Sequence, residues 1–192
     1  MARGRDAQVL EAARRDFQVL LGADLVCVGS GSLESVVLEH LRRRGETLAV
    51  AESMTGGLIQ ARLTAVEGAS EVFLGGAVSY SGHAKIQLVG VPEELIGQHG
   101  TVSDPVTRAM AEGIRCQLGT AWGLAITGNA GPGEDRQGAA PVGTCIIAVA
   151  GPGGTASLTF LFPGERSDVQ ARSATWALDH LRRQILLAGS DS

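Results

Sequence analysis

The order of apolar and amphipathic segments along the chain constrains its fold more than any other feature of the sequence. Short apolar stretches typical of buried strands alternate with segments of helical spacing through the first half of the chain. The last two apolar stretches are instead separated only by Gly-Pro-Gly-Gly, a hairpin-like link. The expected strands lie at 47–52, 72–81, 122–127, 143–150 and 156–162, with helices at 55–66 and 103–119 between the first three. We therefore expect an α/β fold in three layers, a mixed β-sheet covered by helices on both faces.

Further helices are expected near both ends of the chain. Residues 6–21 and 33–44 have helical spacing and are followed by Gly22 and Gly45, which are typical helix stops. A long closing helix is expected at 165–187. Its inward-facing residues are predicted to be Val169, Trp176, Ala177, His180, Leu181 and Ile185. We expect residues 1–32 to form an N-terminal helix and connecting segment, and residues 33–192 to form the domain proper.

Composition and charge exclude several classes of function. Apolar residues make up 44% of the chain and charged residues 19%, which is ordinary usage for a globular protein. The net charge of -4 comes with no clustered positive field, which argues against a nucleic-acid surface. No apolar run approaches the ~20 residues of a membrane span, and the first residues show no signal-peptide centre. We expect a cytoplasmic protein with no nucleic-acid or membrane partner.

The cysteines and histidines do not form an obvious reactive or metal-binding set. Three cysteines far apart in apolar surroundings favour buried free thiols over a disulfide or a catalytic thiol. The histidines lie in separate segments without metal-ligand spacing. These residues are Cys27, Cys116, Cys145, His40, His83, His99 and His180. No phosphate-loop signature is present either, so we expect neither a metal site nor a cofactor.

The segment AESMTGG, which ends at Gly57, places a serine at a junction between an expected strand and an expected helix. Backbone N–H groups point toward such a junction, and the helix dipole favours a developing negative charge. Ser53 is therefore a candidate nucleophile. The alternative is that Ser53 or Thr55 only caps the helix, while Gly56 and Gly57 allow close packing. The local sequence leaves both interpretations open.

Lys85 is the only lysine in a chain with fifteen arginines. Lysine can lose its proton when its surroundings lower its pKa, whereas arginine cannot, so a single lysine suggests a position that needs a base. Tyr80 lies five residues earlier in the same segment, SYSGHAK. His83 is a rival base, although an exposed position in the first turn of a helix is the alternative for it.

The long glycine-rich stretch 126–144 follows an apolar strand. Exposed N–H groups in such a loop can hold a phosphate. The alternative is a mobile surface loop, which Glu134 and Asp135 in its middle also fit.

Five motifs, taken in order, carry a family resemblance. AESMTGG, YSGHAK, HGTVSDPV, TGNAGP and PVGT resemble the C-terminal domain of the competence/damage-inducible CinA proteins, a family that includes stand-alone nicotinamide-nucleotide amidases. The resemblance runs from about Leu33 to Leu187. Full-length CinA proteins also carry a larger N-terminal domain similar to molybdopterin-binding proteins, for which we expect no room in a chain of 192 residues. The resemblance implies that residues 1–32 are the tail of the connecting region.

The resemblance also implies an activity: deamidation of nicotinamide mononucleotide to nicotinic acid mononucleotide with release of ammonia. The family motifs place the nucleophile at Ser53, assisted by Tyr80 and Lys85. Backbone N–H groups near Thr55 to Gly57 are expected to hold the oxyanion, and the loop from Thr127 to Gly131 the phosphate. The expected substrate-binding residues are Glu52, Thr55, Gly56, Gly57, Thr127, Gly128, Ala130, Gly131 and Arg136. A homodimer or higher homo-oligomer is also implied.

The sequence departs from the family motifs at four positions, namely Met54, Gly82, Asn129 and Ala140, where cysteine, asparagine, an aliphatic residue and lysine are common. Met54 leaves a serine mechanism intact. A second interpretation is a nucleotide-binding regulatory or interaction module of the competence or DNA-damage response with little catalysis, because fold alone does not fix activity.

Overall fold

The computed structural model describes residues 2–27, 31–132 and 140–189. Its centre is a five-stranded sheet in the order β2-β1-β3-β4-β5. The strands are β1 (Leu48–Glu52), β2 (Phe73–Val78), β3 (Trp122–Gly128), β4 (Thr144–Gly151) and β5 (Gly154–Leu161). Strand β1 is parallel to both β2 and β3, whereas β4 is antiparallel to β3 and β5. The predicted mixed sheet with a terminal hairpin is confirmed.

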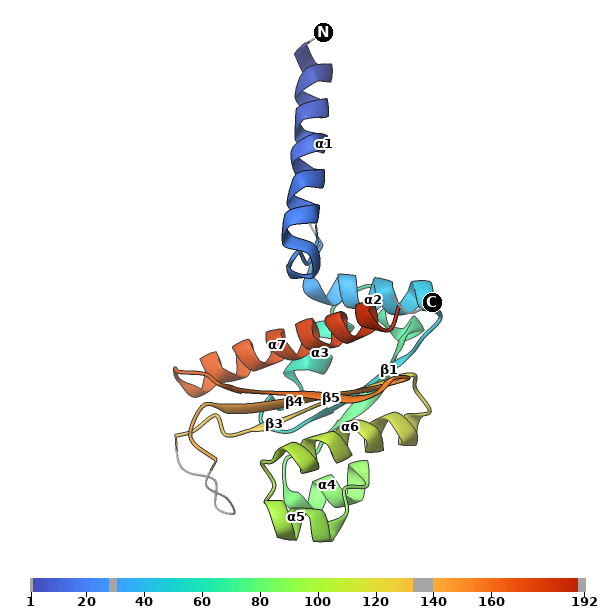
Figure 1. Cartoon of the computed structure of the whole chain (residues 1–192). Helices are drawn as coiled ribbons and strands as arrows, with labels where there is room; N and C mark the ends of the chain where they lie inside the picture. The colour runs from blue at the N-terminus through green and yellow to red at the C-terminus, as the bar shows by residue number, and fades with distance from the viewer. Residues whose placement is uncertain (1, 28–30, 133–139, 190–192) are drawn as a thin grey trace.

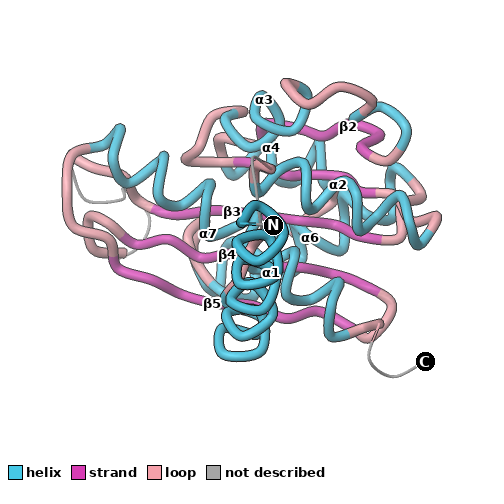
Figure 2. Tube along the Cα trace, turned by 90° about the horizontal axis from the view of Figure 1, so that it is seen from above, coloured by secondary structure: helices cyan, strands magenta, loops and turns pink. Residues whose placement is uncertain are grey.

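Helices cover both faces of the sheet, as Figure 1 shows, and Figure 2 gives the arrangement from above. The helices are α1 (Ala2–Leu21), α2 (Leu33–Arg44), α3 (Leu58–Thr64), α4 (Gly82–Val89), α5 (Glu93–His99), α6 (Asp104–Leu118) and α7 (Arg166–Leu187), with short 3-10 turns at Gly22–Asp24 (η1) and Ala69–Glu71 (η2). Helices α2, α3 and α7 pack on one face, and α4, α5 and α6 on the other. The predicted three-layer α/β architecture is therefore confirmed.

The two faces of the sheet differ in side-chain size. Along β1, Leu48 and Val50 point into the core beneath α2, α3 and α7, whereas Ala49 and Ala51 point toward α6. Small side chains let α6 lie close to the sheet: a Cβ added at Gly123 would lie 2.1 Å from the Ala111 carbonyl oxygen. Close backbone packing thus fixes α6 and, through it, the neighbouring α4.

Replacing Gly113 by alanine should lower the free energy of unfolding by about 1–3 kcal/mol, the usual cost of overpacking a core. The added Cβ would lie 1.7 Å from the Val89 carbonyl oxygen at the end of α4, so α6 and α4 would have to move apart. Urea unfolding followed by circular dichroism measures the change. Gly97→Ala in α5 is the matched control: nothing lies within 4 Å of its added Cβ, and alanine favours a helix. Equal stability of the two variants would contradict the prediction.

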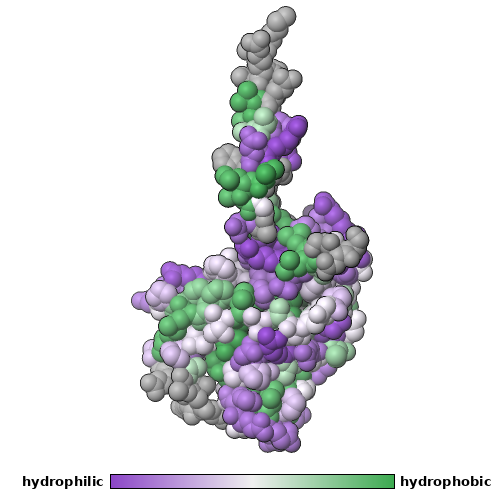
Figure 3. All heavy atoms as spheres, viewed as in Figure 1, coloured by the Kyte–Doolittle hydropathy of each residue, from purple (hydrophilic) through white to green (hydrophobic). Residues whose placement is uncertain are grey.

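Helix α1 stands away from the rest of the structure (Figures 1 and 3). Four of its described apolar side chains are largely exposed, namely Val9, Leu10, Val19 and Leu20. One ion pair between Asp24 and Arg183, 2.9 Å apart, joins the segment after α1 to α7. No helix in the described part of the chain is long and apolar enough to cross a bilayer. The division between residues 1–32 and 33–192 stays a prediction.

One predicted core position is wrong. Trp176 is 43% exposed and lies at the side of α7, where its ring packs on Phe160 with centroids 4.8 Å apart. The other predicted inward-facing residues of this helix are buried: Val169, Ala177, His180, Leu181 and Ile185. Helical spacing identifies the buried stripe but does not show that Trp176 meets the edge strand β5, where one side of its ring stays open.

Candidate active site

The carboxyl edge of the parallel strands brings three distant segments together. Glu52, the last residue of β1, pairs with Val78 of β2 and Ile126 of β3. The chain therefore leaves the sheet at neighbouring points, with Ser53 after β1 and Ser79 after β2. Ligand sites of open α/β sheets lie at such an edge.

The turn after β1 delivers Ser53 to this edge without using its hydroxyl as a cap. The N-cap residue of α3 is Gly57, with φ of 100° and no side-chain cap hydrogen bond of its own. Its N–H donates instead to the carboxylate of Glu52 at 3.0 Å. The Thr55 hydroxyl has no hydrogen-bond partner among the described residues. The alternative that Ser53 or Thr55 caps the helix is therefore wrong.

The segment after β2 brings Lys85 to the same point. The Ser81 hydroxyl accepts a hydrogen bond from the Ala84 N–H at 3.1 Å and starts α4. One turn later, the Lys85 side chain reaches back to the sheet edge, where its Nζ lies 2.9 Å from Ser53 Oγ and donates to the Ser79 carbonyl at 2.9 Å. Lys85 is 1% exposed and Ser53 is 6% exposed. The only lysine in the chain is thus buried against the candidate nucleophile.

This geometry suits removal of a proton from the serine. Burial disfavours the ammonium form of a lysine because that form loses its hydration. A neutral amine can donate one hydrogen to the Ser79 carbonyl and still direct its lone pair at the Ser53 hydroxyl. Direct contact also means that no intermediate group is needed between the base and the nucleophile.

A cavity of about 180 Å³ opens above this pair. It is lined by Ser53, Met54, Tyr80, Lys85, Thr101, Val102, Thr127, Gly128, Asn129, Ala130 and Arg166. Tyr80 lies at the rim with 59% of its surface exposed, and its hydroxyl accepts a hydrogen bond from Arg166 at 2.7 Å. The same guanidinium donates to the Gly131 carbonyl at 2.8 Å. Arg166 therefore bridges the rim and gives the cavity a positive charge.

The structure brings some of the predicted substrate-binding residues to the cavity and not others. Thr127, Gly128 and Ala130 line it, and Gly131 contacts its rim through Arg166. Arg136 lies outside the described residues. The remaining predicted contacts, Glu52, Thr55, Gly56 and Gly57, are not among the lining residues.

Two of the expected oxyanion donors are engaged elsewhere. The Gly56 N–H donates to the Ser53 carbonyl at 3.0 Å, and the Gly57 N–H donates to Glu52. No acceptor among the described residues takes the N–H of Met54 or Thr55. Of the expected donors, the Thr55 N–H is thus left without a described acceptor, and the Met54 N–H immediately precedes the expected stretch.

The sequence patterns miss three residues that shape this site. Arg166 begins α7, far along the chain from Tyr80, and no local pattern links them. Asn129 donates to the Ala140 carbonyl at 3.0 Å and accepts from the Gly131 N–H at 2.9 Å, which joins the two ends of the glycine-rich loop. Gln170 donates to the Met54 carbonyl at 2.6 Å. Only their position in the fold reveals these roles.

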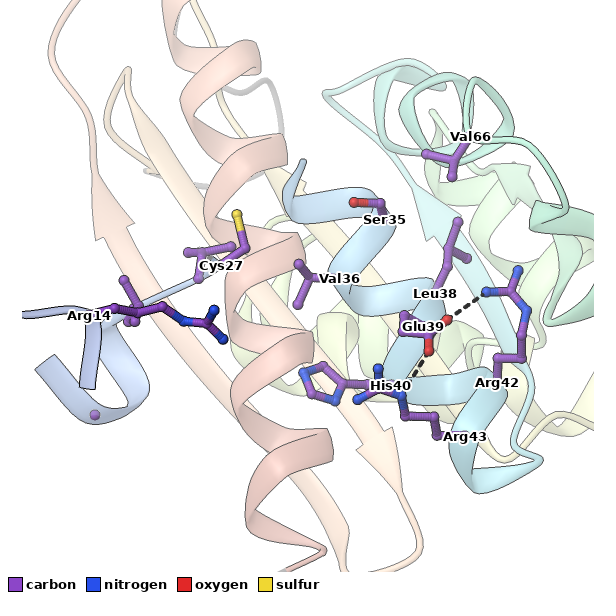
Figure 4. A pocket seen from close by; sticks show the side chains of 13 residues that line it. Arg14, Cys27, Ser35, Val36, Leu38, Glu39, His40, Arg42, Arg43 and Val66 are labelled. Carbon is purple, nitrogen blue, oxygen red and sulfur yellow. Dashed lines mark hydrogen bonds and ion pairs between the residues drawn. The ribbon is translucent and has the colours of Figure 1, made fainter. Parts of the chain in front are cut away.

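A larger cavity, of about 760 Å³, lies between the segment after α1 and the outer face of α2 (Figure 4). Ser35 lines this cavity, and its hydroxyl donates to the Ser32 carbonyl at 2.8 Å. Figure 4 shows the His40 imidazole lying away from the Ser35 hydroxyl. Burial and the positive charge of Arg43 lower the pKa of His40. No base is paired with a nucleophile here, so size alone does not make it the candidate site.

None of the three cysteines, each of which lies in the described part of the chain, lines the cavity above Ser53 and Lys85. All three are free thiols, and burial raises the pKa of Cys145 to about 12. Cys116 is exposed on α6 and Cys27 is only partly buried, which corrects the expectation that every cysteine is buried. Across the described ranges, no three His, Cys, Asp or Glu side chains gather where they could hold a metal ion.

The sequence profile of the CinA C-terminal domain matches residues 30–185. The chain belongs to the CinA family. Among curated CinA relatives, a CinA-like protein of Prochlorococcus marinus is 52% identical over 170 residues, which cover 86% of this chain and 39% of that protein. A CinA-like protein of Myxococcus xanthus is 46% identical over 184 residues, covering 93% of this chain and 42% of the relative. The chain thus spans about two fifths of the length of these CinA proteins.

Solved CinA structures share the fold. A CinA superfamily protein of Klebsiella pneumoniae superposes with a TM-score of 0.77 at 30% identity, covering 80% of this chain and 96% of that one. A competence/damage-inducible protein of Agrobacterium tumefaciens gives a TM-score of 0.72 at 28% identity, with 81% and 96% covered. The α/β sheet and the helices on both its faces are therefore features of the CinA superfamily.

Proposed function

We propose that this CinA domain is an amidohydrolase that converts nicotinamide mononucleotide to nicotinic acid mononucleotide and ammonia. The proposal depends on one observation, the 2.9 Å contact between Lys85 Nζ and Ser53 Oγ in a buried corner of a cavity. Membership of a family that includes nicotinamide-nucleotide amidases supports the choice of substrate. A serine with a neutral lysine beside it is a known means of activating a hydroxyl for acyl transfer.

In the acylation half, the Lys85 lone pair takes the Ser53 proton while Oγ attacks the carboxamide carbon. The C=O electron pair moves to the oxygen and forms a tetrahedral oxyanion. The Lys85 ammonium then gives its proton to the amide nitrogen, the C–N bond breaks, and ammonia leaves. An acyl ester on Ser53 and a neutral lysine remain, so the base is ready for the second half.

The oxyanion would be held by the N–H groups of Met54 and Thr55, which have no acceptor among the described residues. Each well-placed donor of this kind contributes on the order of 3 kcal/mol to the transition state. The pyridinium ring assists by withdrawing electrons from the carboxamide. In the second half, water attacks the ester, its proton passes to Lys85, and the lysine returns a proton to Ser53 as the acid product leaves.

Among the residues that the structure describes, Arg166 is the cation at the rim that would contact the substrate phosphate. Its guanidinium lines the cavity and is held between Tyr80 and Gly131, so it is already placed when substrate arrives. A guanidinium group can donate two parallel hydrogen bonds to a phosphate. Lys85 has no such group and lies in the buried corner of the cavity, away from the rim. Tyr80 then orients Arg166 at the rim, and the proton transfer goes directly between Ser53 and Lys85.

Replacing Arg166 by glutamine should raise KM for the mononucleotide by about 10–100-fold, the cost of losing a charge-assisted contact. The riboside, which has no phosphate, should turn over slowly in the parent and respond little to the change. Steady-state ammonia release with both substrates measures the difference. Arg172→Gln, also on α7, removes a contact to the Pro163 carbonyl away from the cavity and should leave both KM values unchanged. An equal effect of Arg166→Gln on mononucleotide and riboside would contradict a phosphate contact.

The activity itself is tested by incubating the purified protein with nicotinamide mononucleotide and following both ammonia and the acid product. Release of both in equal amounts is the expected result. Absence of ammonia would overturn the proposed function. Saturable binding of the mononucleotide without turnover would favour the nucleotide-binding module.

A further inference from the structure

We propose that Glu52 is a positioning residue for the nucleophile, and that its carboxylate fixes the turn carrying Ser53 instead of contacting the substrate. This inference rests on the proposed function, because it assigns Glu52 a part in presenting the serine for acyl transfer. It replaces the sequence-based prediction of Glu52 as a substrate-binding residue.

The hydrogen bonds of the carboxylate are directed into the protein. One oxygen accepts from the N–H groups of Gly57 at 3.0 Å and Ile59 at 3.2 Å, and the other accepts from Gln60 at 2.9 Å. Glu52 is 0% exposed and does not line the cavity. Both oxygens are therefore engaged by the backbone of the first turn of α3, and neither faces a ligand.

The carboxylate of Glu52 accepts the first N–H groups of helix α3 in place of a capping side chain. It is 7 residues long, and its N-cap position, Gly57, has no side chain to satisfy the first N–H groups. Buried N–H groups without an acceptor are costly, and an anion is favoured at this end of a helix. A carboxylate arriving from the preceding strand satisfies both requirements.

The contact closes a ring around the nucleophile. The chain runs from the Glu52 backbone through Ser53 to Gly57 and returns to Glu52 through the carboxylate. Inside this ring the Ser53 carbonyl accepts from Gly56, and the Met54 carbonyl accepts from Gln170. The orientation of the remaining N–H groups, those proposed to hold the oxyanion, is set by these bonds.

The backbone of the same residue holds the base. The Ser79 N–H donates to the Glu52 carbonyl at 2.7 Å, and the Ser79 carbonyl accepts from Lys85 Nζ. The side chain of Glu52 thus holds the turn that carries the nucleophile, and its main chain holds the segment that contacts the base. Displacement of the turn should misalign Ser53 relative to Lys85 and the oxyanion donors together.

The test compares Glu52→Gln with Glu34→Gln. Glutamine keeps the shape but replaces one acceptor oxygen by a donor, which cannot satisfy the N–H groups of α3. We expect kcat for the mononucleotide to fall by about 10–100-fold, with KM changing less than about two-fold, because only alignment at the reacting carbon is lost. Glu34 is also buried and is paired with Arg62 of α3, so its variant should lose stability without losing kcat.

A second readout separates this inference from the choice of substrate. The acetylation burst with p-nitrophenyl acetate reports the reactivity of Ser53 without the mononucleotide, and amide hydrogen exchange at Ile59 and Gln60 reports the first turn of α3. Both should change in Glu52→Gln and not in Glu34→Gln. Glu52→Asp, which keeps the charge and shortens the reach, should lie between the parent and Glu52→Gln and provides a folded variant if Glu52→Gln does not fold.

The outcomes are distinct. A parent that releases no ammonia from the mononucleotide, but whose burst falls in Glu52→Gln, would overturn the proposed function and support the role of Glu52. An unchanged kcat and burst in Glu52→Gln would overturn that role. An increase in KM with unchanged kcat would also overturn it, because Glu52 would then be a substrate contact.

Discussion

Ser53→Ala should lower turnover of nicotinamide mononucleotide by at least about 10⁴-fold, since no acyl ester can form without the hydroxyl. Alanine removes one buried oxygen that contacts Lys85, so the fold and the cavity should persist. Ammonia release measures the loss, and calorimetric titration should show that the variant still binds the mononucleotide. Binding is expected to survive because the rim of the cavity, including Arg166, is unchanged.

The control for this change is Ser35→Ala. Ser35 lies in the larger cavity beside α2, and its hydroxyl contacts only the Ser32 carbonyl among the described residues. This variant should keep full activity. If Ser53→Ala retained more than about a tenth of the parent rate, Ser53 would not be the nucleophile, and a mechanism with direct attack of water would have to be considered.

Lys85→Met should lower kcat by about 10³-fold, within the range observed when a general base is removed. Methionine fills most of the space of the lysine stem but cannot accept a proton. Stability should be equal or higher, because a buried titratable group is replaced by an apolar one of similar volume. Steady-state kinetics and urea unfolding measure the two effects, and a loss of activity that paralleled a loss of folded protein would not support a base.

Lys85→Arg distinguishes a base from a fixed positive charge. Arginine stays protonated at any accessible pH, so a base cannot be replaced by it, whereas an electrostatic role could be. We expect this variant to be as inactive as Lys85→Met. Substantial activity in Lys85→Arg would show that the positive charge, and not proton transfer, is what the site needs.

The layers of the fold could be predicted because strand and helix periodicities differ strongly in this chain. The alternation of β1, α3 and β2, and the hairpin between β4 and β5, follow from it. Helix α5 could not be predicted, since it buries none of its residues and therefore carries no clear apolar stripe. The spacing of Trp176 predicts that it faces inward, but its ring packs on Phe160 of the edge strand β5 and stays partly exposed.

The candidate site could be predicted only in part, because the sequence shows its residue types but not their contacts. Ser53 and Lys85 stand out by residue type and position, but their contact depends on the neighbouring positions of β1 and β2 in the sheet. Arg166 carries no local signal because it meets Tyr80 only through the placement of α7. The proposed positioning role of Glu52 could not be predicted either. In the sequence, a carboxylate beside a serine fits a ligand contact as well as a contact with the backbone of α3.

The chain contains one lysine, and that lysine is the proposed base. Its ionisation state can therefore be observed without resonance assignment. Protein grown with lysine labelled at Cε and Nζ would give a single side-chain signal in a heteronuclear spectrum, and its shift across a pH series would report the titration of Lys85 alone. Because the chain contains a single lysine, the protonation state of the proposed base can be followed without any substitution in the protein.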